Sequence, residues 1–135
     1  TTCLQPHTTA ARALGTPADL LVLIYSRPTE DGAVRRQRVR ETWARPRSAG
    51  AQCTVLFRFM LGEPTGPADA PAPRDDAPDV VHLQVAEGYA SLSRKVLYGL
   101  AWSLSHVSFA YLLKTDDDAF VCVGALLHVL APIPP

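Results

Sequence analysis

The chain has 135 residues, of which 47% are hydrophobic and 19% are charged, a composition that is ordinary for one globular domain. Thirteen basic residues balance thirteen acidic ones, so the chain as a whole has no electrostatic attraction to nucleic acid or to an anionic membrane. These properties argue against a disordered chain and against nucleic-acid binding, and they leave any charge-driven function to a local cluster of residues.

The first half of the chain predicts two strands and one helix after a polar lead-in at residues 1–18. A continuous apolar run at 19–26, DLLVLIYS, is typical of a parallel strand that is covered on both faces. The segment 30–46 opens with acidic residues and stops at a proline, which predicts a helix. Residues 53–61 are rich in β-branched and aromatic residues and predict a second strand. Five prolines and two glycines exclude a regular element from 62–79, so we expect a mobile surface loop.

The second half predicts a strand at 80–85, a helix at 91–106, a strand at 109–115 and a helix at 123–130. Apolar residues recur at helical spacing in the first of these helices, and we expect them to form the face that packs on the sheet. They are Leu92, Val96, Leu97, Leu100, Ala101 and Leu104. The order β-α-β-β-α-β-α predicts an α/β fold with an open, mostly parallel sheet and crossover helices.

Apolar segments and cysteines say little about the compartment. No apolar run approaches the roughly 20 residues that span a bilayer, and the first residues lack the order of a signal peptide, so we expect this chain to be soluble. Three cysteines, Cys3, Cys53 and Cys122, are too few and too scattered for a disulfide framework or a metal knuckle. We favour buried or free thiols, with one disulfide as the alternative.

Three consecutive aspartates, Asp116, Asp117 and Asp118, follow the fourth predicted strand. Open α/β sheets bind ligands beyond the carboxyl ends of their strands, which is where this triplet falls. Alternate side chains of an extended chain share a face, so we expect Asp116 and Asp118 to point together and Asp117 to point away. A divalent cation such as Mn²⁺ or Mg²⁺, bound with a substrate diphosphate, would offset the repulsion between the carboxylates. An acidic turn or a helix cap is the alternative, but the apolar runs on both sides favour a site.

Four segments together carry a family resemblance. They are RRQRVRETW at 35–43, FMLG at 59–62, EGYASLSRKVLYGLAW at 87–102 and LLKTDDDAF at 112–120. In type and order they resemble the motifs of the family 31 glycosyltransferases, the inverting β-1,3-galactosyl- and N-acetylglucosaminyltransferases of the Golgi. The stretch around the aspartates looks closest to the branch that adds the second galactose of the proteoglycan linkage tetrasaccharide. The resemblance implies a GT-A fold, with residues 19–130 as its donor-binding half and 131–135 as a truncated tail.

The resemblance also implies roles for single residues. Asp118 would coordinate the metal, Asp116 would help to hold the nucleotide sugar, and Asp117 would support both. Lys95 would face the uridine or the diphosphate, although the residues alone allow an exposed helix lysine equally well. Arg40, in the Arg-x-Thr-Trp match, is the other candidate for nucleotide binding.

Other residues of the motifs have plainer expected roles. For Arg36 we favour a solvated basic face paired with Glu41 or Glu30, and we expect Thr42 and Trp43 to anchor the helix in the core. Tyr89 is ambiguous between packing and binding. The histidines are expected to be structural or on the surface; they are His7, His82, His106 and His128.

Two features depart from the family pattern. Ser91 replaces an asparagine and Glu87 replaces an aspartate, which puts nucleotide contacts in doubt more than folding, because serine can cap a helix as asparagine does. The acceptor side and the catalytic base, a downstream carboxylate, have no counterpart before Pro135. We therefore expect the base beyond Pro135, and we expect this chain alone to be inactive.

The resemblance implies a hexosyltransferase that uses UDP-galactose or UDP-N-acetylglucosamine, with Mn²⁺ or Mg²⁺, to extend glycan chains of glycoproteins or proteoglycans. The intact protein would be a type II membrane protein of the Golgi lumen, with an anchor that this chain lacks. One alternative is a truncated, non-catalytic homologue that binds UDP or only folds. Another is a different α/β metal-nucleotide enzyme, although an aspartate-nucleophile phosphatase is disfavoured because Phe120 stands where its motif has threonine. Nucleic-acid binding through the basic run is the weakest reading.

Overall fold

The computed structural model describes residues 15–45, 53–66 and 73–133. Its elements, in chain order, are β1 (Thr16–Tyr25), α1 (Glu30–Glu41), β2 (Val55–Glu63), β3 (Val80–Ala86), the short 3-10 helix η2 (Tyr89–Ser91), α2 (Leu92–His106), β4 (Val107–Asp116) and α3 (Val123–Leu130). The predicted order of strands and helices is confirmed. No helix in the described ranges is long and apolar enough to cross a membrane.

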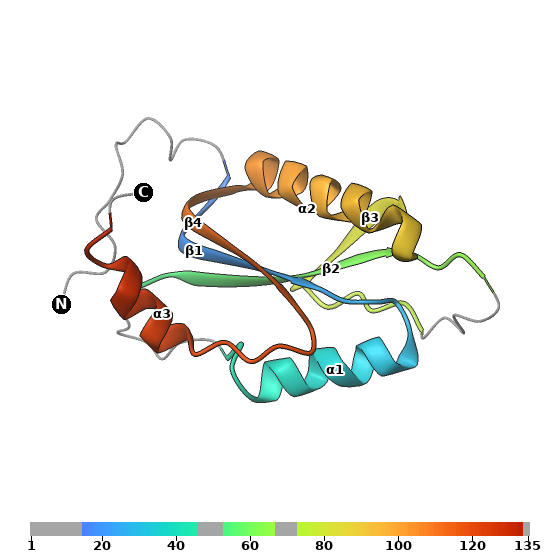
Figure 1. Ribbon diagram of the computed structural model, residues 1–135, viewed down its shortest axis with the longest axis horizontal. Helices are drawn as coiled ribbons and strands as arrows, with labels where there is room; N and C mark the ends of the chain where they lie inside the picture. Colours follow the sequence, from blue (N-terminus) through green and yellow to red (C-terminus); the bar gives the residue numbers. More distant parts are fainter. Residues whose placement is uncertain (1–14, 46–52, 67–72, 134–135) are drawn as a thin grey trace.

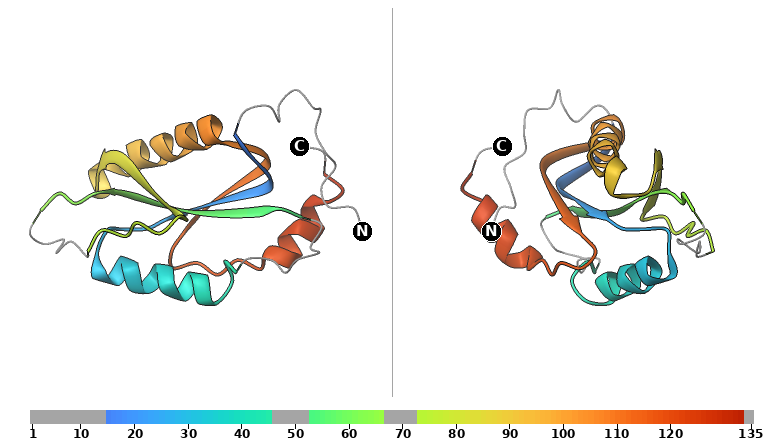
Figure 2. Two further views of the ribbon diagram at one scale, coloured as in Figure 1. Left: turned by 180° about the vertical axis from the view of Figure 1, so that it is seen from behind. Right: turned by 45° about the vertical axis from the view of Figure 1, so that its right-hand side comes forward.

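The strands form one open sheet in the order β3-β2-β1-β4, and every pairing is parallel. Helix α2 covers one face, while α1 and α3 lie on the other (Figures 1 and 2). The predicted α/β class is therefore confirmed, as a Rossmann-like arrangement consistent with a GT-A fold. Strands β1 and β4 begin before the predicted positions, because residues 16–18 pair with residues 107–109.

The two-sided cover explains the continuous apolar run of β1. Leu20, Val22 and Ile24 belong to the core beneath α1 and α3, and they alternate with residues that belong to the core beneath α2. These are Leu21, Leu23 and Tyr25. Both sets are almost completely buried, so a strand in this position needs apolar side chains on both faces.

Helix α1 ends earlier than the proline in the sequence predicts. The hydroxyl of Thr29 accepts the N–H of Gly32 at 3.1 Å and caps the start of the helix. The last helical residue is Glu41 rather than a residue next to Pro46, because the backbone leaves helical geometry at Thr42. Thr42 is exposed, so its predicted core role is wrong.

The chain after α1 turns one large aromatic side chain into the core. Trp43 is 9% exposed and belongs to the core beneath α1, and its Nε1–H donates to the carbonyl of Ala119 at 3.0 Å. The predicted core role of Trp43 is confirmed. This bond also ties the end of α1 to the segment that follows the aspartate triplet.

The face of α2 that packs on the sheet differs from the predicted one. Val96 and Leu100 pack against the core as expected, whereas Leu97 and Leu104 are 64% and 75% exposed. Leu92 and Ala101 are exposed as well. The buried residues of the helix are Lys95, Gly99 and Ser103, a polar and small-residue line that apolar spacing does not reveal.

The remaining predictions concern the cysteines and the proline-rich segment. Cys53 is disulfide-bonded, so the preference for free thiols is wrong there, while Cys122 is a free, exposed thiol. Cys3 lies outside the described residues. In the segment 62–79, strand β2 continues to Glu63, residues 67–72 fall outside the description, and residues 73–79 contact α1 through their carboxylates.

Candidate functional site

The carboxyl ends of β1 and β4 lie side by side, because Tyr25 and Asp116 are register partners. From β1 the chain adds β2 and β3 on one side and then places β4 on the other. Open α/β sheets bind ligands at this kind of switch point. A cleft of about 480 Å³ opens there, lined by the ends of both strands, the start of α1 and the residues that lead into α2. We call it the aspartate cleft.

All three residues of the aspartate triplet line this cleft. Strand β4 ends at Asp116, and a turn follows in which the N–H of Ala119 donates to the carbonyl of Asp116 at 3.2 Å. The side chains of Asp116 and Asp118 are 59% and 70% exposed, whereas that of Asp117 is 11% exposed. The two outer carboxylates are therefore the exposed ones. Strand alternation, from which their common direction was predicted, is not the cause, because the strand stops before Asp117.

Two cations of the chain already lie beside the triplet. The Nζ atom of Lys114 is 3.0 Å from Asp116 Oδ1. The Nη1 atom of Arg35 is 3.5 Å from Asp117 Oδ1 and 3.9 Å from Asp118 Oδ2. These contacts reduce the repulsion among the carboxylates without any ligand, an effect that the sequence pattern assigned to a metal diphosphate.

Lys95 lies in the wall of the aspartate cleft and is 4% exposed. Its Nζ atom donates to the carbonyl of Ser26 at 2.6 Å and lies 2.6 Å from Glu87 Oε1. Burial lowers the pKa of Lys95, although the hydrogen bond and the charge of Glu87 act in the opposite direction. The exposed helix lysine is thus excluded, and Lys95 shares one cleft with the triplet. Its contact with a nucleotide stays a prediction.

Glu87, which the sequence marked as a departure from the family pattern, is an internal partner of Lys95. It also accepts the N–H of Gly62 at 2.6 Å. A Cβ atom at Gly62 would lie 2.8 Å from Glu87 Oε1 and 2.7 Å from the carbonyl oxygen of Val85. Only glycine therefore lets β2 approach this carboxylate so closely.

Tyr25 is a cleft residue that the sequence analysis missed. Its ring centroid lies 5.3 Å from Lys114 Nζ and 6.0 Å from Lys95 Nζ, and its hydroxyl donates to the carbonyl of Val96 at 3.0 Å. Burial, and then the charge of Asp116, raise the pKa of Tyr25 to about 12. The hydroxyl therefore keeps its proton at neutral pH. Its position as the last residue of the central strand was the available signal.

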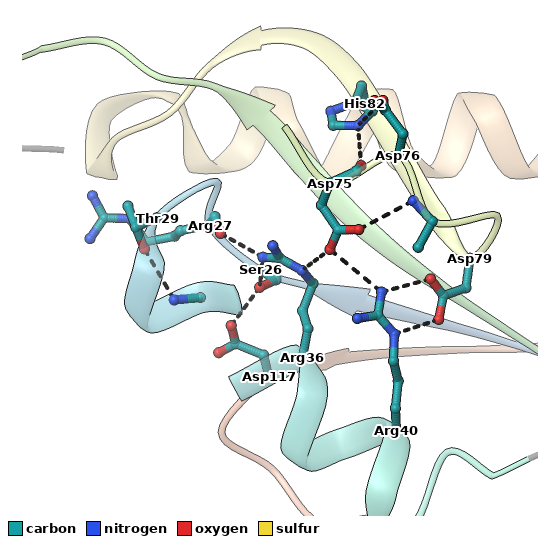
Figure 3. A network of polar contacts seen from close by, with 12 residues as sticks. Ser26, Arg27, Thr29, Arg36, Arg40, Asp75, Asp76, Asp79, His82 and Asp117 are labelled. Carbon is teal, nitrogen blue, oxygen red and sulfur yellow. Dashed lines mark hydrogen bonds and ion pairs between the residues drawn. The ribbon is translucent and has the colours of Figure 1, made fainter. Parts of the chain in front are cut away.

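Ser26, which lines the cleft, was missed by the sequence analysis, and Arg36, which does not line it, was misjudged. The Ser26 hydroxyl donates to Asp117 Oδ2 at 2.7 Å, and Arg36 Nη1 donates to Ser26 Oγ at 3.1 Å (Figure 3). Arg36 is 1% exposed, and it also donates to the carbonyl of Arg27 at 2.7 Å and to Asp75 at 3.0 Å. The predicted solvated basic face is therefore wrong, because the partners of Arg36 come from the end of β1 and from a segment 39 residues away.

Arg40 does not lie in the aspartate cleft. It donates through Nε and Nη2 to both carboxylate oxygens of Asp79, at 2.8 Å and 2.7 Å (Figure 3). Its guanidinium also lies 4.9 Å from the ring centroid of Phe59. The hydrogen bond to Asp79 is the largest cause of the raised pKa of Arg40. Arg40 therefore does not share the cleft of the triplet, and its contact with a nucleotide stays a prediction. Its acidic partners lie in the proline-rich segment, which apolar patterning could not place.

Tyr89 and His128 are exposed, and His82 and His106 make hydrogen bonds to backbone carbonyl groups. Tyr89 is 95% exposed and lines the mouth of the aspartate cleft. His82 Nε2 lies 2.8 Å from the carbonyl oxygen of Asp75, and His106 hydrogen-bonds within its own helix. These two histidines are structural, as predicted, and His128 is exposed. His7 lies outside the described residues.

The donor atoms in the cleft fit a hard cation that arrives with its own ligands. Among the residues that the structure describes, no group of three or more His, Cys, Asp and Glu side chains forms a ready metal site. Asp116 and Asp118 nevertheless offer open carboxylates. Mn²⁺ and Mg²⁺ commonly take one or two carboxylates and complete their shell with phosphate and water.

Comparisons with known proteins agree with this arrangement. A family model described as galactosyltransferase matches residues 34–132. The chain is 35% identical to beta-1,3-galactosyltransferase 4 of Canis lupus familiaris, over 94% of this chain and 35% of that protein. It is 33% identical to beta-1,3-galactosyltransferase 6 of Mus musculus, over 90% of this chain and 38% of that protein.

A third relative is named for a different activity. The human acetylgalactosaminyl-O-glycosyl-glycoprotein beta-1,3-N-acetylglucosaminyltransferase is 31% identical, over 86% of this chain and 32% of that protein. The chain thus spans about a third of the length of these curated relatives. Residues 34–132, which the family model matches, include the aspartate triplet and most of the elements that surround it.

Proposed function

Because this chain belongs to the galactosyltransferase family, we propose that it is the donor-binding part of an inverting β-1,3-glycosyltransferase. Residues 19–130 would bind the UDP-sugar. UDP-galactose is the first candidate donor, since several relatives are named as galactosyltransferases, and UDP-N-acetylglucosamine is the second. The acceptor would be a glycan chain of a glycoprotein or proteoglycan, and the linkage-region acceptor stays a prediction from the resemblance.

The observation that carries this proposal is the shared cleft of the aspartate triplet and Lys95 at the switch point of the sheet. A diphosphate needs cations, and the three carboxylates of the triplet carry one negative charge more than the flanking Lys114 and Arg35 balance. A metal diphosphate meets both needs at once. The cleft volume of about 480 Å³ lies within the range of small-molecule sites.

Roles then follow for the residues of the cleft. Asp118 would hold the metal directly, Asp116 would contact the ribose or the water shell of the metal, and Asp117 would support both. Lys95 has three ammonium hydrogens, of which Ser26 and Glu87 accept two, so one hydrogen is left for a phosphate oxygen. When bound, the metal would supply charge stabilisation for the departing UDP. The base for the acceptor hydroxyl is not assigned to any residue of this chain.

The proposed location of the intact protein is the Golgi lumen, with a type II membrane anchor. The disulfide of Cys53 supports a compartment of the secretory pathway, because disulfides persist there and are rare in the cytosol. Protease protection of the full-length protein in sealed Golgi vesicles would test this location.

Calorimetric titration of UDP into the chain, with and without Mn²⁺, tests the donor site. We expect binding that requires Mn²⁺ and disappears in Asp118→Ala. Asp76→Ala is the matched control, because Asp76 is equally open at 72% exposure, pairs with Arg74 and does not line the cleft. A folded chain that binds no UDP would contradict the proposal and favour the alternative of a homologue that only folds.

A further inference from the structure

Ser26 connects the aspartate cleft to α1 and to residues 75–79 (Figure 3). It is 2% exposed and directly follows the last residue of β1. Its carbonyl accepts the ammonium group of Lys95, and its hydroxyl contacts both Asp117 and Arg36. One buried residue therefore contacts the lysine and the inner aspartate of the cleft.

The direction of these hydrogen bonds follows from the groups involved. A guanidinium only donates and an ionised carboxylate only accepts. The Ser26 hydroxyl has one hydrogen, so it accepts from Arg36 at 3.1 Å and gives that hydrogen to Asp117 at 2.7 Å. The charge of Arg36 thereby selects the hydroxyl orientation that holds Asp117 inward.

Arg36 is itself held in place from several sides. The carbonyl of Arg27 and the carboxylate of Asp75 accept its other hydrogen bonds. Gly32 leaves room for it, since a Cβ atom there would lie 3.2 Å from Arg36 Nη1 and 2.1 Å from the carbonyl oxygen of Arg27. Arg36 is thus fully buried and bonded to two other segments of the chain, residues 26–27 and Asp75, which together fix the position of its guanidinium.

We propose that Arg36 is a positioning residue for the donor site, which acts through the Ser26 hydroxyl to keep Asp117 inward and the carboxylates of Asp116 and Asp118 open. The inference rests on the donor-binding function proposed above. Arg36 does not line the cleft, and of the cleft residues that accept its hydrogen bonds, Ser26 is the one that also bonds Asp117.

The test compares Ser26→Ala, Arg36→Met and the double variant by calorimetric titration of UDP in the presence of Mn²⁺. Each single variant should raise the Kd about tenfold, the effect of losing one hydrogen bond to a charged group. The double variant should be no weaker than Ser26→Ala, because both changes interrupt the same connection. Ser26→Thr, which keeps the hydroxyl, should restore the Kd toward that of the wild type.

The number of binding sites separates positioning from folding. A positioning role raises the Kd while the fitted stoichiometry of the folded sample stays unchanged, whereas a purely structural role lowers the stoichiometry and leaves the Kd unchanged. Ser105→Ala is the matched control, because this exposed serine donates only within its own helix, to the carbonyl of Ala101 at 3.0 Å.

The outcomes are distinct. If the wild type binds UDP and Ser26→Ala binds it with the same Kd, this inference is overturned and the proposed function stays intact. The same holds if the effects of the two single variants on the Kd add up in the double variant. A wild-type chain that binds no UDP would overturn the proposed function and the inference with it.

Discussion

Lys95 and Glu87 form an ion pair in which each side chain is only 6% exposed. Removing one partner leaves the other charge buried, so Lys95→Met should lower the free energy of unfolding by about 3–5 kcal/mol. The double variant Lys95→Met/Glu87→Gln should lose less, because glutamine still accepts the N–H of Gly62 and carries no charge. Denaturant titration measures both changes. Equal losses in the two variants would show that the buried charge is not the cause.

Asp75 should make the stability of the chain depend on pH at the acid end. Burial acts to raise its pKa, but the N–H of Ala77, the hydrogen bond from Arg36 and the charges of Arg36 and Arg40 lower it overall. A lowered folded-state pKa means that the stabilisation is complete above the ordinary value, about 3.9, and is lost as the pH falls through the folded value.

Asp75→Asn should therefore flatten the loss of Tm between about pH 5 and pH 2. Asp76→Asn, the same chemical change at the more exposed neighbour, should leave the slope close to that of the wild type. Thermal unfolding over this pH range would decide the matter, and an acid slope of Asp75→Asn equal to that of the wild type would contradict the role of the Arg36 contact.

Motifs in the sequence identified the residues of the cleft that lie within them, but they could not identify contacts between residues that are far apart in the chain. The triplet and Lys95 were found because the motifs place them at strand and helix ends. The burial of Arg36 and the internal pairing of Arg40 were missed, because their carboxylate partners lie 39 residues away in a segment without periodicity. Ser26 carries no pattern, and only its position after β1 distinguishes it from other serines.

The packing face of helix α2 could not be predicted from the spacing of its apolar residues. Apolar spacing marked a broad stripe, yet the line that contacts the sheet includes Gly99 and Ser103. A Cβ atom at Gly99 would lie 2.2 Å from the hydroxyl oxygen of Tyr25. The helix lies close to the sheet because these positions are small, and hydrophobic patterning has no measure of such closeness.

Gly99→Ala should therefore destabilise the chain by about 1–3 kcal/mol, although alanine favours helix. Gly124→Ala in α3 is the matched control, since a Cβ atom there meets nothing within 4 Å, and it should be neutral or stabilising by up to about 1 kcal/mol. Thermal or denaturant unfolding of both variants would measure the difference. Equal effects would mean that α2 can move away from Tyr25 at no cost.

The whole sheet is organised around β1, which has a neighbour on each side and helices over both faces. Class and element order could be predicted because strands and helices alternate in the sequence. Strand order and the first residues of the strands could not be predicted, because they depend on pairing between β1 and β4, which lie about 90 residues apart.

Hydrogen exchange should reproduce this organisation. The backbone amides of residues 21–24, which are 0% exposed and lie on the central strand, should exchange most slowly. The backbone amides of the edge strands β3 and β4 should exchange faster. Exchange measured by NMR or mass spectrometry would show it. Edge-strand protection equal to that of β1 would contradict the view of β1 as the most stable element.

The free thiol of Cys122 has a practical consequence. It is exposed, directly precedes α3 and lies four residues after Asp118, whereas Cys53 is disulfide-bonded. A maleimide fluorophore would therefore react at Cys122 within the described part of the chain. A dye in that position would sense changes in the turn after β4, and it would turn ligand titrations of this protein into fluorescence assays.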